Sequence, residues 1–128
     1  MIKARTSCMG ELERAVMDQL WSADVDQWLT VREVHEALAA DRDIAYTTVM
    51  TVMDRLSKKS LVSQKKGGRA YRYQAYASRG AMTADMMREA LDEFSLKDRR
   101  TALIAFVGDA SSEEIAALRQ ALADLEGR

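Results

Sequence analysis

The fold is indicated most clearly by residues 45–75, which read AYTTVMTVMDRLSKKSLVSQKKGGRAYRYQA. Apolar residues recur there at three- and four-residue intervals, the spacing of an amphipathic helix. This pattern predicts a helix from about Tyr46 to Lys59, with an inward stripe of Val49, Val52, Met53 and Leu56.

The opposite face of this predicted helix is unusual. Helical geometry places there Thr47, Thr48, Thr51, Arg55 and Lys58. Threonine is a mediocre helix former, so helix propensity does not explain three of them within five positions. A helix that lies close against another surface would explain them.

Two β-prone runs follow the predicted helix, over residues 61–65 and 70–75. The turn between them contains Gly67 and Gly68, which supply the positive φ angles that tight hairpins need. Side chains alternate along a strand. We therefore expect Tyr71 and Tyr73 to pack on the helices, while Arg72 points to the other face.

The preceding residues supply the rest of the fold. Residues 11–23 have the spacing of a first helix, and residues 28–31 form a short extended stretch. Thr30 and Glu33 form a capping-box pattern that starts a second helix, over residues 31–40, which is expected to bury Val34, Ala37 and Leu38. The order helix, strand, helix, helix, strand, strand predicts a winged helix-turn-helix, in which a recognition helix enters the major groove of DNA and a hairpin wing contacts the backbone.

Positive charge is concentrated in the same region, although the net charge of the chain is only −1. Residues 55–80 hold eight basic residues and no acidic one, whereas residues 1–54 hold five basic against ten acidic residues. Such a block is typical of a surface that neutralises phosphates. A solvated basic face without a ligand remains the alternative on charge alone.

The C-terminal part has only helical patterns, over residues 79–94 and 97–107 and after a second capping box at Ser111 and Glu114. So few residues bury little apolar surface alone, which favours pairing with a second copy over folding back on the first domain. The predicted architecture is mainly α with a small β-hairpin: a winged-helix DNA-binding domain over residues 1–77, with a tail over 1–9, and a helical dimerisation domain over 78–128. The expected dimer interface comprises Met82, Met86, Leu91, Phe94, Leu103, Phe106, Ile115, Leu118, Leu122 and Leu125.

Other classes of protein find little support. His35 is the only histidine, and neither a nucleophile nor metal-ligand spacing surrounds it, so we expect no enzyme, metal or cofactor. Cys8 is the only cysteine and is expected to be a free thiol in the tail. The first residues lack a secretion signal and no stretch is apolar enough to span a membrane, which predicts a cytoplasmic protein without membrane insertion.

Several segments resemble the penicillinase-repressor (BlaI/MecI) family of bacterial transcriptional regulators. The segments, spread from residue 10 to the C-terminal part, are Gly10–Glu13, Val16–Met17, Leu20–Trp21, Ala45–Val49, Arg55–Leu56, Lys58–Val62, Arg69–Tyr73 and Phe106–Gly108. The resemblance implies a homodimer that binds a palindromic operator and represses genes, often a β-lactamase gene of antibiotic resistance and its sensor.

The resemblance also implies that a membrane sensor protease relieves repression by cutting before a phenylalanine, which corresponds here to the bond Ala105–Phe106. The best-known members have asparagine where this chain has Ala105. Ser60 replaces the glycine that commonly ends the recognition helix, where a left-handed residue costs about 1 kcal/mol without glycine. Copper-sensing relatives carry a C-terminal cysteine cluster, which this chain lacks.

The residues expected to contact double-stranded operator DNA fall into two groups. From the recognition helix, Thr47, Thr48 and Thr51 are expected to read base edges. Tyr46 and Arg55 are expected at phosphates or a base edge, and Lys58 at the backbone. From the wing, Lys65, Lys66, Arg69 and Arg72 are expected to hold the backbone. The competing hypothesis is a winged helix that serves as a protein-interaction adaptor, with its basic face against an acidic partner.

Overall fold

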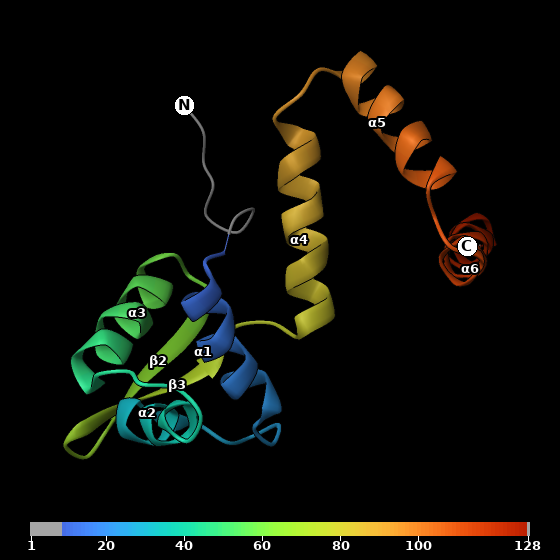
Figure 1. The fold of residues 1–128 in the computed structure, drawn as a ribbon. Coiled ribbons are helices and arrows are strands. Elements are labelled where there is room, and N and C mark those ends of the chain that lie inside the picture. Colours follow the sequence, from blue (N-terminus) through green and yellow to red (C-terminus); the bar gives the residue numbers. More distant parts are fainter. Residues whose placement is uncertain (1–8, 128) are drawn as a thin grey trace. The chain divides into compact units, whose positions relative to one another are not determined.

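The computed structural model describes residues 9–127 and is mainly helical with one small sheet (Figure 1). Residues 1–8, with Cys8 and most of the expected tail, lie outside the described residues. The elements are α1 (Glu11–Ser22), β1 (Leu29–Thr30), α2 (Val31–Ala39), α3 (Tyr46–Lys58), β2 (Val62–Gly67), β3 (Ala70–Ala75), α4 (Arg79–Asp92), α5 (Leu96–Gly108) and α6 (Ser112–Glu126). The predicted fold class and order of elements are confirmed.

Both predicted capping boxes are present. At α2, the Thr30 hydroxyl accepts a hydrogen bond from the Glu33 amide at 3.1 Å, and the Glu33 carboxylate accepts one from the Thr30 amide at 2.8 Å. At α6, Ser111 and Glu114 make the same reciprocal bonds at 3.1 and 2.8 Å. Each box satisfies amides that the first turn of a helix leaves unpaired, so these two starts are fixed by local sequence.

The sheet has the strand order β1-β3-β2, and both pairs of neighbours are antiparallel. Gly67 pairs with Ala70, which leaves Gly68 and Arg69 as a two-residue turn. Gly68 has φ +68°, the conformation that a glycine at the first central position of such a turn allows. The turn therefore matches the prediction, although β2 starts one residue later and ends two residues later than expected.

The core lies between α1, α2, α3 and the sheet. All four residues of the predicted α3 stripe are buried, together with Val34 and Leu38 of α2. Two expectations were wrong. Ala37 is exposed, because α2 turns only one narrow face to the core. Tyr71 is 49% exposed while Tyr73 is buried at 5%, since the sheet rests on the core at its base and the hairpin extends past it.

The start of α4 is fastened to α1. The Trp21 Nε1 atom donates a hydrogen bond to the Ala77 carbonyl at 3.0 Å, and the Arg79 guanidinium lies 4.7 Å from the centre of the Trp21 ring. Arg79 also forms an ion pair with Asp18 at 2.6 Å. These contacts hold the first turns of α4 against the core of the winged helix.

This attachment changes the expected role of the first methionine of α4. Met82 is only 3% exposed and belongs to the hydrophobic core, with Met86 packed beside it. Met82 was predicted for the dimer interface, but almost none of its surface is left for a second copy. By its internal contacts the chain divides into two units, residues 1–90 and 91–128, whereas the sequence suggested a boundary after residue 77.

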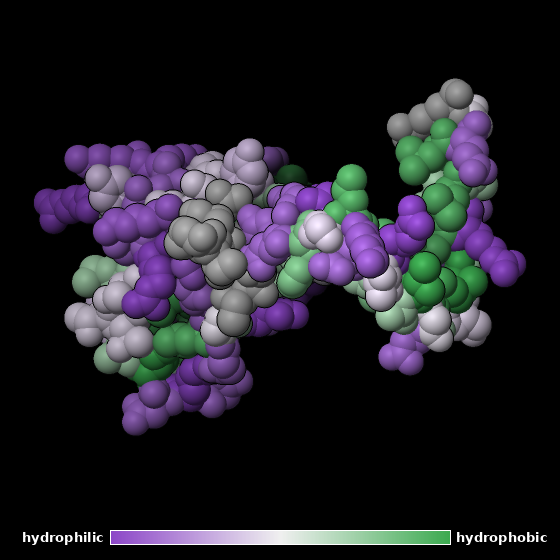
Figure 2. All heavy atoms as spheres, turned by 90° about the horizontal axis from the view of Figure 1, so that it is seen from above, coloured by the Kyte–Doolittle hydropathy of each residue, from purple (hydrophilic) through white to green (hydrophobic). Residues whose placement is uncertain are grey.

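The second unit exposes much apolar surface. Helices α5 and α6, described in full, contain no buried residue. Hydrophobic side chains gather on the surface of these C-terminal helices in the space-filling view (Figure 2). The large exposed hydrophobic residues of the second unit are Phe94, Leu96, Leu103, Ile104, Phe106, Val107, Leu122 and Leu125. Within residues 9–127, no helix is both long and apolar enough to cross a membrane.

Candidate nucleic-acid interface

Helix α3 exposes the face that the sequence analysis assigned to DNA. Thr47, Thr48, Thr51, Arg55 and Lys58 are all exposed. The Thr51 hydroxyl donates a hydrogen bond to the Thr47 carbonyl at 3.0 Å. Its proton is therefore engaged, while its oxygen lone pairs and its methyl group remain available to a ligand.

His35, the only histidine of the chain, positions the start of α3. His35 Nε2 lies 2.8 Å from the Ile44 carbonyl oxygen, and the His35 ring meets the Tyr46 ring edge-on with 5.8 Å between centroids. These contacts link α2 to the residues that lead into α3. His35 thus has a structural role that orients Tyr46 at the first turn of α3.

The end of α3 is fixed by a partly buried ion pair. The Lys59 Nζ atom lies 3.0 Å from the Oε2 atom of Glu13, whose residue is only 6% exposed. Burial raises the pKa of Glu13, but the hydrogen bonds from Lys59 and the Gly10 amide, together with the charges of Lys59 and Arg55, leave it below its ordinary value. The carboxylate is therefore held charged, and it ties α3 to the first turn of α1.

The connection from α3 to the wing requires a left-handed residue. Ser60 has φ +65°, and the Leu61 amide donates to the Leu56 carbonyl at 3.0 Å across it. The Ser60 amide donates to the Ser57 carbonyl at the same distance, which completes a Schellman motif. The departure noted in the sequence therefore falls on a conformation that favours glycine.

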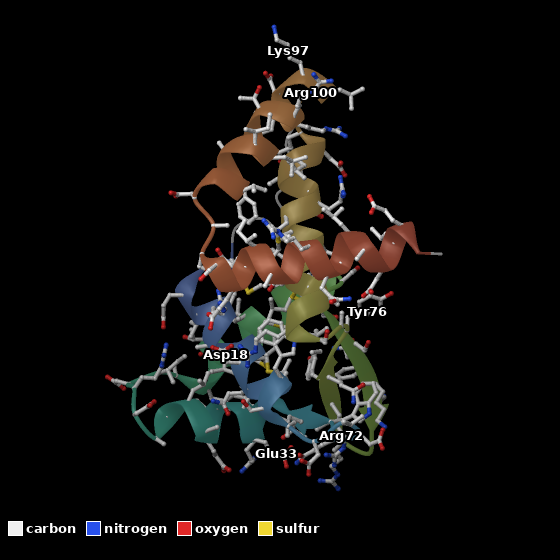
Figure 3. All side chains as sticks on the ribbon, turned by 90° about the vertical axis from the view of Figure 1, so that its right-hand side faces the viewer. Asp18, Glu33, Arg72, Tyr76, Lys97 and Arg100 are labelled. Atoms are coloured by element: carbon white, nitrogen blue, oxygen red, sulfur yellow. The ribbon has the colours of Figure 1, made fainter. Side chains whose placement is uncertain are left out.

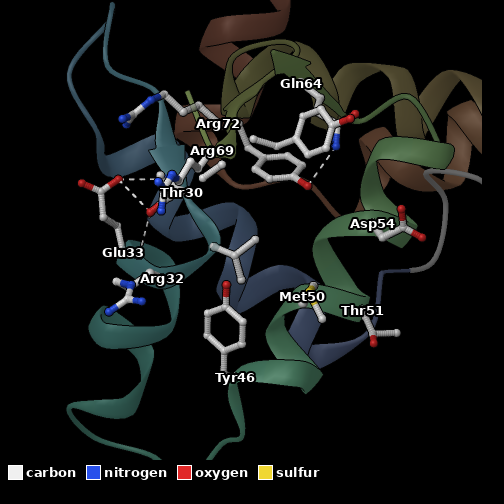
Figure 4. Close-up of a pocket in the computed structure, with 14 residues that line it drawn as sticks. Thr30, Arg32, Glu33, Tyr46, Met50, Thr51, Asp54, Gln64, Arg69 and Arg72 are labelled. Carbon is white, nitrogen blue, oxygen red and sulfur yellow. Dashed lines mark hydrogen bonds between the residues drawn. The ribbon is translucent and has the colours of Figure 1, made fainter. Parts of the chain in front are cut away.

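A groove of about 850 Å³ lies between α3, the start of α2 and the wing (Figure 4). One wall is α3, and the other is β3 with the hairpin turn. Gln64 Nε2 donates to the Tyr73 hydroxyl at 2.9 Å and closes the base near the core. The lining residues are Thr30, Val31, Arg32, Glu33, Tyr46, Met50, Thr51, Asp54, Gln64, Arg69, Ala70, Tyr71, Arg72 and Tyr73.

The wing cations surround this hairpin rather than sharing one face. Lys65 pairs with Arg72 across the strands, and its ammonium lies 4.4 Å from the centre of the Trp28 ring. Lys66 pairs with Tyr71, one position along and thus on the opposite face. Arg69 occupies the turn. In the stick view Arg72 lies at the same end of the winged helix as Glu33 of α2 (Figure 3).

The structure separates the basic block into two kinds of residue. Lys59 and Arg79 form ion pairs with acids of α1, so their charges serve the fold. The remaining six cations belong to the outward face of α3 or to the wing: Arg55, Lys58, Lys65, Lys66, Arg69 and Arg72. The groove residues that were not predicted as DNA contacts from the sequence include Arg32, Met50 and Asp54. The helical spacing of Asp54 from Thr51 was a signal that could have revealed it.

An exposed helix face rich in hydroxyl groups, next to a basic hairpin on this fold, is typical of a DNA-binding protein of the winged-helix class. The chain belongs to the penicillinase repressor family, whose model matches residues 9–124. It is 50% identical over 124 residues to the transcriptional regulator BlaI of Mycobacterium tuberculosis strains H37Rv and CDC 1551, with 96% of this chain and 88% of the relative covered. These findings identify a regulator rather than an enzyme.

Solved structures agree on the fold. The solution structure of the DNA-binding domain of the repressor BlaI matches with a TM-score of 0.51 at 24% identity, covering 62% of this chain and 90% of that domain. The complex structure of hsRosR-S4 matches with a TM-score of 0.51 at 17% identity, covering 89% of this chain and 96% of that one. At these identities the likeness concerns the fold alone.

Proposed function

We propose that the chain represses transcription in the cytoplasm by binding a palindromic operator as a homodimer. The outward face of α3 enters the major groove, and the wing lies on the adjacent backbone. One observation carries the proposal: Thr51 of the exposed α3 face and the wing arginines Arg69 and Arg72 line the same groove. A duplex can meet both sets of side chains at once only if they share one side of the fold.

The threonines supply sequence readout in this proposal. Thr47, Thr48 and Thr51 offer short side chains with a hydroxyl and a methyl, which suit base amines and the thymine methyl group. Because the Thr51 proton is bound to the Thr47 carbonyl, Thr51 acts as an acceptor or through its methyl. Tyr46, held by His35, is directed to a phosphate or a base edge at the start of α3.

The cations supply affinity that does not depend on sequence. Arg55 and Lys58 flank the threonines on α3, and the wing provides the remaining charges: Lys65, Lys66, Arg69 and Arg72. Each phosphate that they neutralise releases counterions, so binding weakens as salt rises. Arg32 at the start of α2 lines the same groove and adds a seventh positive group near the backbone.

The second unit is proposed to pair with a second copy. Helices that bury nothing in the single chain leave apolar side chains in water, which association would remove. The side chains that remain for this interface after Met82 is removed, with Met86 already packed on the core, are Leu91, Phe94, Leu103, Phe106, Ile115, Leu118, Leu122 and Leu125. A two-fold dimer would place its operator half-sites about one helical turn apart, or a multiple of it.

Release from DNA is proposed to follow cleavage by a membrane sensor protease at the bond Ala105–Phe106, with β-lactamase or other stress-response genes under control. Both residues are exposed. They lie within α5, so a protease must first unwind that helix. The cut would separate Phe106 and α6 from the rest of the chain, and with them five of the eight side chains of the proposed interface.

Selection of DNA fragments from a random pool tests the proposal. The expected result is a palindromic sequence bound by a dimer, far more tightly than a scrambled duplex of the same composition. Selection that returns no preferred sequence would favour the adaptor hypothesis. In that case an acidic polypeptide should compete for the basic face as well as DNA does.

A further inference from the structure

An acidic residue stands in the middle of the face that is proposed to meet DNA. Thr47, Thr51, Asp54 and Lys58 follow one another at intervals of four, three and four residues, which places them in one line along α3. The buried stripe occupies the opposite side. Asp54 therefore points outward with the threonines, and it lines the groove beside Thr51 and Met50 (Figure 4).

The charge of Asp54 is only partly compensated. Its Oδ2 atom lies 3.1 Å from the ammonium of Lys58, and its side chain is 57% exposed. No hydrogen bond involves its Oδ1 atom among residues 9–127, so one carboxylate oxygen is free to accept. A carboxylate so placed repels the phosphates of every duplex, whatever its sequence.

We propose that Asp54 is a specificity-determining residue of this repressor, an inference that rests on the proposed function. Its free oxygen accepts a hydrogen bond from the exocyclic amine of a cytosine in the major groove, the base that carboxylates recognise there. At sites without that amine the repulsion is not offset. Asp54 thereby lowers affinity for unselected DNA more than it lowers affinity for the operator.

A purely structural role makes a different prediction. An aspartate four residues before a lysine forms an ion pair that stabilises a helix slightly. If Asp54 did only this, its loss would change the stability of α3 and would alter affinity for all duplexes by the same factor. The ratio of operator affinity to scrambled-duplex affinity distinguishes the two roles, because a structural effect cancels in it.

The experiment uses the full chain, the duplex that the wild-type protein selects from a random pool, and a scrambled duplex of the same composition. We expect Asp54→Asn to tighten binding to the scrambled duplex and to lower the affinity ratio about 5- to 100-fold. Asp54→Glu keeps the charge but displaces the carboxylate. It should lose operator affinity without gaining affinity for the scrambled duplex. Asp85→Asn on α4, an exposed acid outside the groove, gives the same change in net charge as a control.

Repeating the selection with Asp54→Asn adds a second readout, since one cytosine position of each half-site should lose its preference. An affinity ratio that stays within about twofold of the wild type would overturn the inference while leaving the proposed function intact. So would a drop of the same size with Asp85→Asn. If the wild-type protein selects no duplex, the proposed function fails and the inference fails with it.

Discussion

The ammonium of Lys59 lies 3.0 Å from the carboxylate of Glu13 and so joins the end of α3 to the first turn of α1. Lys59 belongs to the basic block by sequence, yet it faces the interior. Its neighbour Lys58 carries the same charge, is exposed and pairs with Asp54 on the surface. Adjacent lysines thus have different roles, one in the fold and one in the proposed interface.

Replacing Lys59 should therefore be costly. We expect Lys59→Met to lower the free energy of unfolding by about 1–3 kcal/mol, because it leaves a buried carboxylate without its partner. Urea denaturation followed by the fluorescence of Trp21 and Trp28 measures this. Lys58→Met is the matched control and should change stability by less than about 0.5 kcal/mol. Equal effects of the two changes would contradict the assignment.

The same pair predicts how stability depends on pH. The pKa of Glu13 in the folded chain is below its ordinary value of 4.5, so the pair stabilises the fold fully above that value. This stability is lost as the pH falls from the ordinary pKa through the folded one. In Lys59→Met the loss of stability at acidic pH should be smaller than in the wild type. A pH dependence of stability equal to that of the wild type would show that Glu13 is not held by Lys59.

The left-handed residue at the end of α3 offers a stabilising change. Ser60→Gly should raise the free energy of unfolding by about 0.5–1 kcal/mol, because glycine adopts φ +65° without steric cost. Ser57→Gly, one turn earlier in helical conformation, should lower it by a similar amount. Thermal unfolding of both variants checks this. Destabilisation by Ser60→Gly would mean that the serine side chain makes a contact worth more than the strain.

The proposed dimer depends on the apolar seam of α6, formed by Ile115, Leu118, Leu122 and Leu125. Leu122→Asp should shift the protein from dimer to monomer in sedimentation velocity and weaken operator binding, because it places a charge in an apolar contact. Gln120→Asp, on the opposite side of the same helix, introduces the same charge and should remain dimeric. A dimer that survives Leu122→Asp would remove this seam from the interface.

The proposed readout of bases depends on Thr51. Thr51→Val keeps the shape and the methyl group but removes the oxygen, and should lower operator affinity about 5- to 30-fold while affinity for a scrambled duplex stays constant. Thr83→Val is the control, since the Thr83 hydroxyl makes the same bond to a carbonyl four residues earlier, but on α4. Equal loss on both duplexes would argue against base readout by Thr51.

Local signals predicted much of the fold. The capping boxes at Thr30 and Ser111, the buried stripe of α3 and the glycine turn of the wing each depend on residues within a few positions of one another. Short motifs and helical periodicity identified these features because residues a few positions apart decide the local structure there.

Contacts between distant residues were not predictable in this way. The pairs Lys59–Glu13 and Arg79–Asp18 join residues 46 and 61 positions apart, so a charge count could not reveal that two cations turn inward. Met82 looked like part of a continuous stripe on α4. Its burial follows from the attachment of Ala77 to Trp21, which no helical pattern encodes.

The central claim is that the wing and the recognition helix together hold a nucleic-acid duplex. The slope of operator affinity against salt concentration, on logarithmic axes, tests it most directly in the wild type and in the double variant Lys66→Ala/Arg69→Ala. If both side chains neutralise phosphates, the slope should become shallower by about 2. A slope equal to that of the wild type would place the wing outside the interface and contradict the claim.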